Sequence, residues 1–252
     1  MRAVIVDLDG VVYRAMSPVP GAAAALQRLI VAGTPIRFVT NNSTKTPHQV
    51  AQKIQQLTGV DVDPETVLTS AMAAVSLLSP EDGPVMVVGE QGIEDALSSA
   101  ALTITDDPDE AGTVVVGLDR GIDYPKLAAA ATAVRGGARF IASNPDPTFP
   151  SSEGLLPGAG SIVAAIAAAS GREPEVAGKP HLPMRRLVRN SGVAAAWVIG
   201  DRIDTDVAMA EAEEDWEAIL VMTGVTDTSE AGSSTARVVP DLAAAVDLVL
   251  DG

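Results

Sequence analysis

Short runs of apolar residues alternate along the chain with longer segments in which apolar residues recur at helical spacing. Such runs are typical of strands buried on both faces of a parallel sheet, with helices as the crossover connections. Strands are expected at residues 3–6, 36–39, 85–88, 101–105, 113–116, 139–142, 195–199 and 218–221. Helices are expected at residues 21–31, 47–57, 91–99, 125–135, 162–169, 183–189, 204–211 and 241–250. The pattern therefore predicts an α/β protein built on parallel sheets.

Two segments rich in proline, glycine and acidic residues interrupt this alternation, at residues 79–84 and 171–178. Such segments are typical of loops between compact units. We expect the chain to leave one unit near Pro80 and to return to it near Gly178. Residues 145–160, which are rich in proline, serine and glycine, are expected to form a loop.

The composition narrows the class of partner. The chain has 252 residues, with 33 Asp and Glu against 17 Lys and Arg, a formal net charge of −16 at pH 7, and no cysteine. This charge argues against a nucleic-acid partner or an anionic membrane surface, because both require clustered basic residues. The first apolar run is too short for a signal peptide, and no run approaches the roughly 18 apolar residues of a membrane span. We therefore expect a cytoplasmic protein.

Four polar clusters follow apolar runs, at residues 7–11, 40–42, 178–180 and 200–206. In an open parallel sheet, ligands bind at the carboxyl ends of the strands. The first cluster contains Asp7 and Asp9, which could bind Mg²⁺ or act as a nucleophile and a general acid on a phosphate ester. Gly10 would let backbone N–H groups approach a phosphate. The alternative is a turn rich in aspartate and glycine.

The next two clusters offer hydrogen-bond donors and a cation. Thr40, Asn41 and Asn42 could bind phosphoryl oxygens, or could cap the helix that follows them. Lys179 lies between a glycine and a proline. It could offset the charge of a nucleophile and a phosphoryl group, or it could be a solvated loop lysine.

The fourth cluster is acidic. Asp201 ends a predicted strand and could bind a metal ion, with Asp206 supporting it from the following helical turn. The alternative is acidic capping of that helix.

In this order, the four clusters resemble the four motifs of the haloacid dehalogenase (HAD) superfamily. More narrowly, the chain is similar to the NagD-like, class IIA phosphatases, relatives of 4-nitrophenylphosphatase and phosphoglycolate phosphatase. The similarity covers nearly the whole chain and includes residues 69–72, 137–141, 143–146 and 223–225. One departure is visible: relatives usually carry a glycine after the helix that follows the fourth motif, whereas residues 210–216 contain none.

The resemblance implies a Rossmann-like catalytic core with an inserted α/β cap of the C2 type. Residues 1–79 and 179–252 would form the core, and residues 80–178 the cap. In the cap, Asn144, Asp146 and residues 155–161 are candidates for recognising the leaving group.

The resemblance also assigns roles to the residues of the four clusters. Asp7 would be the nucleophile and a Mg²⁺ ligand, and Asp9 the general acid and base, binding the metal through its backbone carbonyl. Asp201 would ligate Mg²⁺, with Asp206 as a weaker or indirect ligand. Lys179 would offset charge, and the phosphoryl group would be bound by Thr40 together with Asn41 or Asn42.

The function expected is Mg²⁺-dependent hydrolysis of a small phosphomonoester through an aspartyl-phosphate intermediate. Sugar phosphates, glycerol phosphate, phosphoglycolate and nucleotide-like substrates all remain open, and the resemblance leaves a homodimer open too. A phosphoacceptor signalling domain uses similar groups, but it is much shorter and carries its acceptor later in the chain. A non-catalytic protein that binds a metal or a sugar phosphate would use the same groups and remains the alternative.

Overall fold

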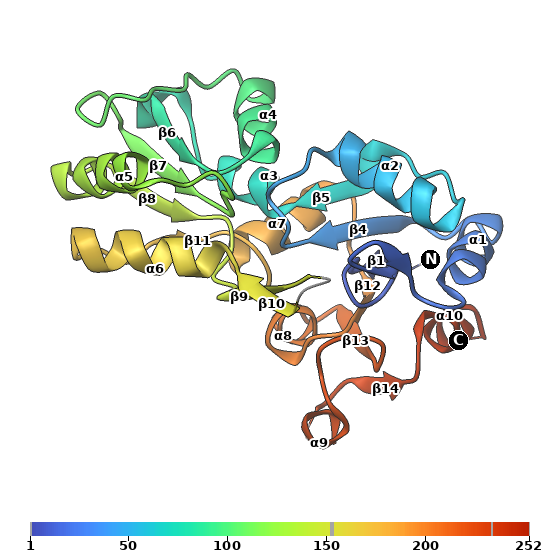
Figure 1. The fold of residues 1–252 in the computed structure, drawn as a ribbon. Helices are drawn as coiled ribbons and strands as arrows, with labels where there is room; N and C mark the ends of the chain where they lie inside the picture. The colour runs from blue at the N-terminus through green and yellow to red at the C-terminus, as the bar shows by residue number, and fades with distance from the viewer. Residues whose placement is uncertain (1, 152–153, 233, 252) are drawn as a thin grey trace. The chain divides into compact units, whose positions relative to one another are not determined.

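The computed structural model describes residues 2–151, 154–232 and 234–251 and contains two compact units (Figure 1). Unit 1 comprises residues 1–40, 48–68 and 188–252, and unit 2 comprises residues 41–47 and 69–187. Each unit is built on its own sheet of parallel strands flanked by helices. The α/β class predicted from the apolar runs is therefore confirmed.

Unit 1 contains a six-stranded sheet with the order β14-β13-β12-β1-β4-β5. These strands are β1 (Ala3–Val6), β4 (Ile36–Thr40), β5 (Val67–Thr69), β12 (Ala196–Gly200), β13 (Trp216–Val221) and β14 (Arg237–Val239). β1 pairs in parallel with β4 on one side and with β12 on the other. Along the chain, β4 and β5 are added on one side of β1, and β12, β13 and β14 are added later on its other side. β1 and β12 therefore form the topological switch point, the place where open α/β sheets bind ligands.

Helices cover both faces of the sheet of unit 1. On one face lie α1 (Ala22–Val31), α2 (Pro47–Thr58) and α10 (Leu242–Asp251), whose apolar side chains share one core with β1 and β4. In α1 the buried residues recur at helical spacing and include Leu26 and Leu29, which are fully buried. Leu220 of β13 contacts a separate cluster that includes Val207 and Ala231. The elements carrying that cluster are a π-helical turn (Ile203–Val207), α8 (Ala208–Glu211) and α9 (Thr228–Ala231).

Unit 2 contains a four-stranded parallel sheet with the order β11-β8-β7-β6. Its strands are β6 (Val85–Val88), β7 (Thr113–Val116), β8 (Arg139–Ala142) and β11 (Glu175–Val176). Helices α5 (Tyr124–Gly136) and α6 (Ala159–Ser170) pack on one face, while α3 (Ser70–Val75) and α4 (Gln91–Ser99) lie on the other (Figure 1). All four residues of β7 are buried, as expected for a strand covered on both faces.

Several short elements connect the larger ones. Tyr13–Arg14 (β2) and Ser17–Pro18 (β3) pair as a small hairpin, and α7 (Leu182–Asn190) follows β11. Short 3₁₀ turns occupy Pro64–Thr66 and Pro80–Asp82. None of the helices in the described ranges combines the length and apolar character needed to cross a bilayer.

The strand expected at residues 101–105 is wrong. Ala101 adopts a left-handed φ of 55° directly after α4, which departs from the extended backbone of a strand. Only Ile104 pairs, in an isolated bridge with Val85. The β-branched residues of this segment carried the prediction, but the exit from the helix determines its backbone.

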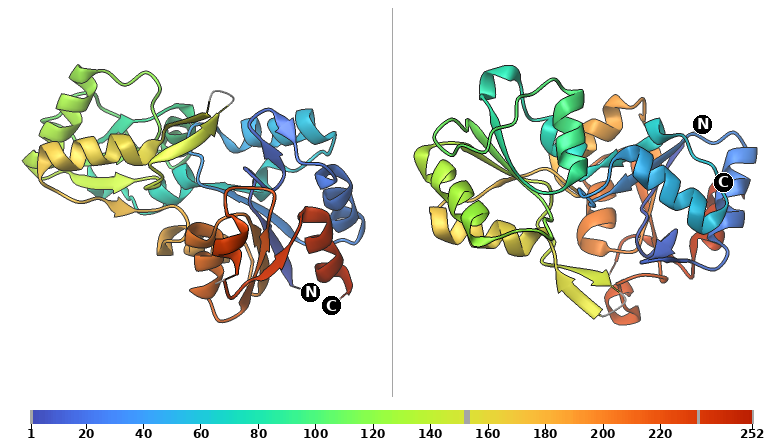
Figure 2. Two further views of the ribbon diagram at one scale, coloured as in Figure 1. Left: turned by 60° about the horizontal axis from the view of Figure 1, so that its bottom comes forward. Right: turned by 45° about the horizontal axis from the view of Figure 1, so that its top comes forward.

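The loop expected at residues 145–160 is also wrong in part. Thr148–Ser151 (β9) and Gly154–Pro157 (β10) form an antiparallel hairpin, yellow in Figure 2, which extends away from the four-stranded sheet. α6 then begins at Ala159. The prolines in this stretch indicated a loop, but a two-stranded hairpin tolerates proline at edge positions.

The helix expected at residues 204–211 is divided into the π-helical turn and the short helix α8. α8 ends at Glu211, and the next residue, Ala212, keeps a right-handed conformation with φ −79°. Its N–H group bonds the carbonyl of Ala208. The helix therefore ends without the left-handed glycine that relatives usually carry.

Arg139 at the start of β8 provides a test of what stabilises unit 2. Its guanidinium donates to the Leu77 carbonyl at 3.0 Å, to Asp82 at 2.7 Å and to Glu175 at 2.9 Å. Replacing it (Arg139→Met) should lower the free energy of unfolding by about 1 kcal/mol, because these partly exposed charge-assisted bonds are lost. Urea unfolding at pH 7 measures the change, and Arg172→Met, at an exposed arginine of the same unit, is the control.

Wild type and Arg139→Met should also differ in how their stability depends on pH. The hydrogen bond from Arg139 holds the pKa of Asp82 below its ordinary value. A carboxyl group with a lowered folded pKa stabilises the fold above its unfolded pKa and ceases to do so as the pH falls through the folded value. The stability difference between wild type and Arg139→Met should therefore shrink below about pH 4. A difference that stayed constant into acid would contradict the assignment.

Candidate active site

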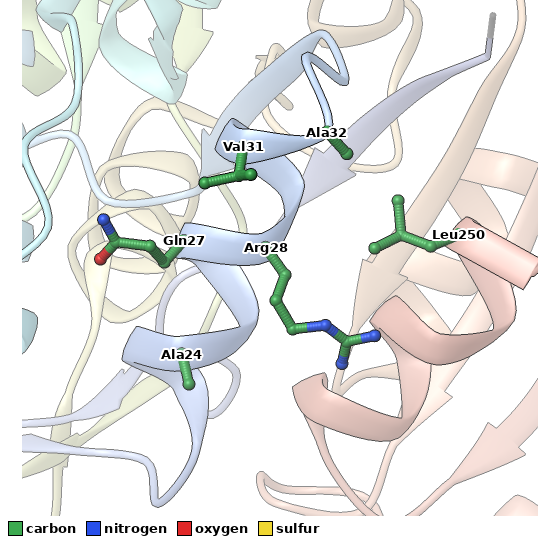
Figure 3. A pocket seen from close by; sticks show the side chains of 6 residues that line it. All are labelled: Ala24, Gln27, Arg28, Val31, Ala32 and Leu250. Carbon is green, nitrogen blue, oxygen red and sulfur yellow. The ribbon is translucent and has the colours of Figure 1, made fainter.

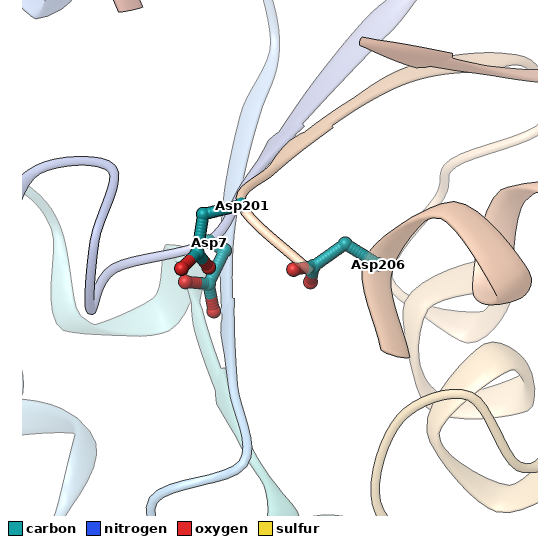
Figure 4. Close-up of side chains that lie close together, drawn as sticks. All are labelled: Asp7, Asp201 and Asp206. Carbon is teal, nitrogen blue, oxygen red and sulfur yellow. The ribbon is translucent and has the colours of Figure 1, made fainter. Parts of the chain in front are cut away.

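Three buried aspartates lie together at the switch point of unit 1 (Figure 4). Asp7 follows β1 and Asp201 follows β12, and the Asp7 N–H group bonds the Ile199 carbonyl at 2.9 Å, which continues the strand pairing by one residue. Asp206 points toward them from the π-helical turn. Each residue offers one oxygen, and the three oxygens lie within 4.8 Å of one another. Three of the four acidic residues predicted for the metal site are thereby brought together.

This arrangement is suited to a divalent cation. Like charges at this distance in a buried place destabilise one another, and a hard cation with oxygen ligands removes that repulsion. The exposed fractions are 8% for Asp7, 1% for Asp201 and 2% for Asp206. The donor set, carboxylate oxygens alone, fits Mg²⁺ better than a soft metal. The residues present therefore fit the metal that the resemblance implies.

Asp201 is held by a loop that follows β13. The Val225 N–H group donates to its Oδ2 at 2.8 Å, and the Thr226 hydroxyl donates to its backbone carbonyl at 2.7 Å. Two glycines make room for the carboxylate: a Cβ on Gly224 would lie 1.8 Å from Oδ2, and a Cβ on Gly10 would lie 2.5 Å from it. A side chain at either glycine would therefore collide with the metal cluster.

Asp206 is held in a similar way. The Arg202 N–H group donates to its Oδ2 at 3.2 Å, and a Cβ on Gly200 would lie 2.4 Å from the same oxygen. The π-helical turn permits this, since the N–H groups of both Asp206 and Val207 bond the Arg202 carbonyl. Such turns are frequent at functional sites.

Asp9 lies in the tight turn between β1 and β2 and is half-buried. The turn closes through the Gly10 N–H group, which bonds the Tyr13 carbonyl at 2.8 Å, and Gly10 adopts a φ of 88°. Gly10 is thus required by its backbone conformation as well as by its contact with Asp201. The Asp9 side chain is not one of the three clustered carboxylates.

Tyr13 completes this turn. Its ring is buried, with the Lys53 ammonium 3.7 Å from the ring centre. Burial, together with the nearby charges of Asp9 and Asp7, raises the pKa of Tyr13 well above its ordinary value, so its hydroxyl stays protonated. Thr40 is buried at the carboxyl end of β4, the strand that pairs with β1.

A second polar cluster lies in unit 2 and centres on Asn41. Its Oδ1 accepts from the Lys179 N–H group at 2.8 Å, while its Nδ2 donates to the Lys179 carbonyl at 3.3 Å and to Asp146 Oδ2 at 3.2 Å. The amide of Asn41 thus engages both sides of Lys179. Lys179 itself is buried, at 3% exposure.

The backbone of Asn41 is fixed as well. Its carbonyl accepts from Asn144 Nδ2 at 2.7 Å and from the Ser70 hydroxyl at 2.6 Å. The side chain of Asn144 in turn accepts from the Asp146 N–H group at 3.1 Å. Asn42 caps its own turn, because its Oδ1 accepts from the N–H and hydroxyl groups of Thr44. Asn41, Asn144, Asp146 and Lys179, predicted separately, form one network.

Sequence reasoning missed the groups that hold these side chains. They are the N–H groups of Val225 and Arg202, and the hydroxyls of Thr226 and Ser70. Backbone donors leave no residue-type signal. Among these residues, Arg202 lies within the fourth polar cluster, whereas Val225 and Ser70 lie in segments 223–225 and 69–72, which only the resemblance includes.

A groove of about 580 Å³ between α1 and α10 is lined by no acidic residue among those described (Figure 3). It is lined by Ala24, Gln27, Arg28, Val31, Ala32 and Leu250. Its charged lining residue, Arg28, is paired with Asp247 at 2.7 Å. The groove is therefore not a candidate catalytic site.

Comparison with known proteins agrees with this geometry. Residues 4–103 match the family described as haloacid dehalogenase-like hydrolase, and residues 176–245 match a related HAD-hydrolase-like family. An acid sugar phosphatase of Staphylococcus haemolyticus is 39% identical over 238 residues, which cover 91% of this chain and 88% of that protein.

Solved structures are similar over the same extent. The glycerol phosphate phosphatase of Mycobacterium tuberculosis in complex with magnesium has a TM-score of 0.87 at 35% identity, with 95% of this chain and 74% of that chain covered. NagD from Escherichia coli has a TM-score of 0.84 at 34% identity, with 96% and 97% covered.

A parallel sheet with clustered aspartates at its switch point is typical of a Rossmann-like protein that binds a cation, and these similarities identify the family as one of hydrolases. The chain belongs to the haloacid dehalogenase-like hydrolases. Its likeness to NagD confirms the NagD-like, class IIA resemblance seen in the sequence.

The network around Asn41 predicts a cost for its removal. Asn41→Ala leaves the Lys179 N–H group and one oxygen of Asp146 without this partner, which should lower the free energy of unfolding by about 1–3 kcal/mol. Asn41→Asp should cost more, because it places a carboxylate against Asp146. Chemical denaturation measures both, with Asn190→Ala at an exposed asparagine as the control. Wild-type stability in Asn41→Ala would show that the network contributes little.

Proposed function

We propose that this chain is a Mg²⁺-dependent phosphatase that hydrolyses a small phosphomonoester through an aspartyl-phosphate intermediate. The observation that carries the proposal is the buried cluster of Asp7, Asp201 and Asp206 at the switch point of a parallel sheet. The relatives named acid sugar phosphatase and glycerol phosphate phosphatase support the reaction class.

Asp7, Asp201 and Asp206 would hold the Mg²⁺ ion, together with the backbone carbonyl of Asp9. When bound, Mg²⁺ would offset the negative charge on the phosphoryl oxygens. Glycine at positions 10, 200 and 224 leaves room for the carboxylates, because a Cβ at any of these positions would overlap Asp201 or Asp206.

The chemistry itself is assigned to two carboxyl groups. An oxygen of Asp7 attacks phosphorus, and the bond from phosphorus to the ester oxygen breaks while Asp9 gives that oxygen a proton. Asp9, now a carboxylate, then takes a proton from water, whose oxygen attacks the aspartyl phosphate. Phosphate leaves and Asp7 is restored as a carboxylate.

Thr40, Asn41, Asn42 and Lys179 are assigned to the phosphoryl group. Lys179 supplies positive charge, and Thr40 a hydroxyl donor. Because the amide of Asn41 is bonded to Lys179 and Asp146, we assign its role to the backbone N–H group and to positioning Lys179.

Residues 1–79 and 179–252 are proposed to act as the catalytic core, and residues 80–178 as the cap that selects the leaving group. Asn144, Asp146 and residues 155–161 are the proposed selecting groups. The relatives' names favour polyol and sugar phosphates as substrates. The proposed location is the cytoplasm, and a second copy of the chain, which the resemblance allows, is not required by this chemistry.

Purified protein should release phosphate from 4-nitrophenyl phosphate with Mg²⁺, and removal of the metal with EDTA should abolish the reaction. Absorbance of 4-nitrophenolate measures the rate. Binding of a sugar phosphate without turnover of any phosphomonoester in a broad panel would favour the non-catalytic alternative. Comparison of kcat/KM across that panel identifies the preferred substrate class.

The two carboxyl groups should differ in what their loss does. Asp7→Asn removes the nucleophile and should lower kcat by at least about 10⁴-fold. Asp9→Asn keeps the nucleophile and should lower kcat by about 10²–10⁴-fold, and a stoichiometric phosphoryl-enzyme should accumulate when the leaving group needs no proton. Asp95→Asn, at an exposed position of α4, is the control. An active Asp7→Asn protein would remove Asp7 as the nucleophile.

A further inference from the structure

Thr223 joins the loop after β13 to the turn that follows β1. Its hydroxyl donates to the Gly10 carbonyl at 2.6 Å, and its own carbonyl accepts from the Arg14 guanidinium. Gly10 comes directly after Asp9, and Arg14 lies at the end of β2, where the turn is complete. One threonine therefore spans the segment that follows Asp9.

Gly10 is the residue of this turn whose backbone has the widest choice of conformations. The N–H groups of residues 11–13 all bond the Leu8 carbonyl, and the side chains of residues 11–13 are buried. Gly10 has no side chain to pack, and it adopts a φ of 88°. Glycine loses more conformational freedom on folding than any other residue. The bond from the Thr223 hydroxyl therefore restrains the turn at its least restrained residue.

The peptide group that Thr223 holds comes directly after Asp9, so its orientation affects where the Asp9 carboxyl group lies. In the proposed reaction, Asp9 gives a proton to the ester oxygen and later takes one from water. Proton transfer requires hydrogen-bond distance, and a misplacement of about 1 Å can cost about 10²-fold in rate. We propose that Thr223 is a positioning residue for Asp9. The inference rests on the proposed function, because it takes Asp9 to transfer these protons.

The next threonine of the same loop has a different target. The Thr226 hydroxyl donates to the backbone carbonyl of Asp201 at 2.7 Å. The loop thus carries two threonine hydroxyls, of which that of Thr223 meets the turn of Asp9 and that of Thr226 meets a proposed metal ligand. Loss of the first should impair proton transfer, whereas loss of the second should impair the reaction of every substrate alike.

The test compares two substrates whose leaving groups differ in their need for a proton. 4-Nitrophenolate leaves without one, whereas the alkoxide of an alkyl phosphate must be protonated. The ratio of kcat/KM for 4-nitrophenyl phosphate to kcat/KM for the alkyl phosphate hydrolysed fastest therefore measures proton donation. Thr223→Val removes the hydroxyl and keeps the branched shape, and it should raise this ratio about tenfold. Thr223→Ser keeps the hydroxyl and should retain the wild-type ratio.

A second readout uses 4-nitrophenyl phosphate alone. Asp9 must activate water before the aspartyl phosphate can break down, so Thr223→Val should slow this step more than the release of 4-nitrophenolate. A burst of 4-nitrophenolate, up to one equivalent of enzyme and larger than that of wild type, should then precede the steady state. Stopped-flow absorbance measures the burst.

Thr66→Val is the matched control. The Thr66 hydroxyl also donates to a backbone carbonyl, that of Asp63, at 2.6 Å, but Thr66 precedes β5 at the amino end of that strand. This variant should keep wild-type kinetics. Thr226→Val should lower kcat/KM for both esters by the same factor. Should Thr223→Val fail to fold, Arg14→Met carries the test and should raise the ratio about threefold.

The outcomes separate the inference from the proposed function. A folded Thr223→Val protein with the wild-type ratio and no added burst would overturn the inference alone. So would an equal loss for both esters, because a merely structural role slows both, and so would an equally selective loss in Thr226→Val. In Arg14→Met, an unchanged ratio would count in the same way. A wild-type protein that turned over no phosphomonoester would overturn the proposed function, and the inference with it.

Discussion

The parallel pairing of β1 with β12 is the interaction on which the site depends. It joins two segments that lie almost 200 residues apart in the sequence, and the bond from the Asp7 N–H group to the Ile199 carbonyl extends the pairing at the carboxyl ends of the two strands. As a result, Asp7 and Asp201 leave adjacent strands in the same direction. Because β4 pairs with β1 on its other side, Thr40 lies at the carboxyl end of a third neighbouring strand. A shift of one residue in the pairing would turn these side chains to the other face of the sheet.

Close packing against glycine is the second constraint. Asp201 and Asp206 lie against three glycines so closely that no other residue fits beside them. Backbone N–H groups then orient each carboxylate without adding a charge that would compete with a cation. The negative cluster is thereby fixed in advance of metal binding, which lowers the cost of organising the site when the ion arrives. A strongly acidic chain can act on an anionic substrate because the positive charge would come from the ion and Lys179.

The network of hydrogen bonds around Asn41 fixes polar side chains in unit 2, as packing against glycine fixes carboxylates in unit 1. One side-chain amide bonds both sides of Lys179 and also Asp146, and one carbonyl receives Asn144 and Ser70. Residues from four separate segments are joined at one asparagine. An arrangement of this kind is cooperative, since loss of one member removes hydrogen bonds from several others.

The sequence by itself determined the α/β class and most of the helices and strands, and it indicated which polar residues are candidates for the chemistry. Apolar runs and helical spacing report burial, and aspartate, lysine and asparagine report their chemistry, wherever they stand. The sequence could not determine elements whose backbone is set by their neighbours, such as the hairpin of residues 148–157 or the exit from α4 at Ala101. Nor could it determine which oxygen of Asp201 is held and by what, because a backbone N–H group is the same in every residue but proline. Only the folded loop of residues 223–226 decides that, by bringing Val225 to Asp201 across the sequence.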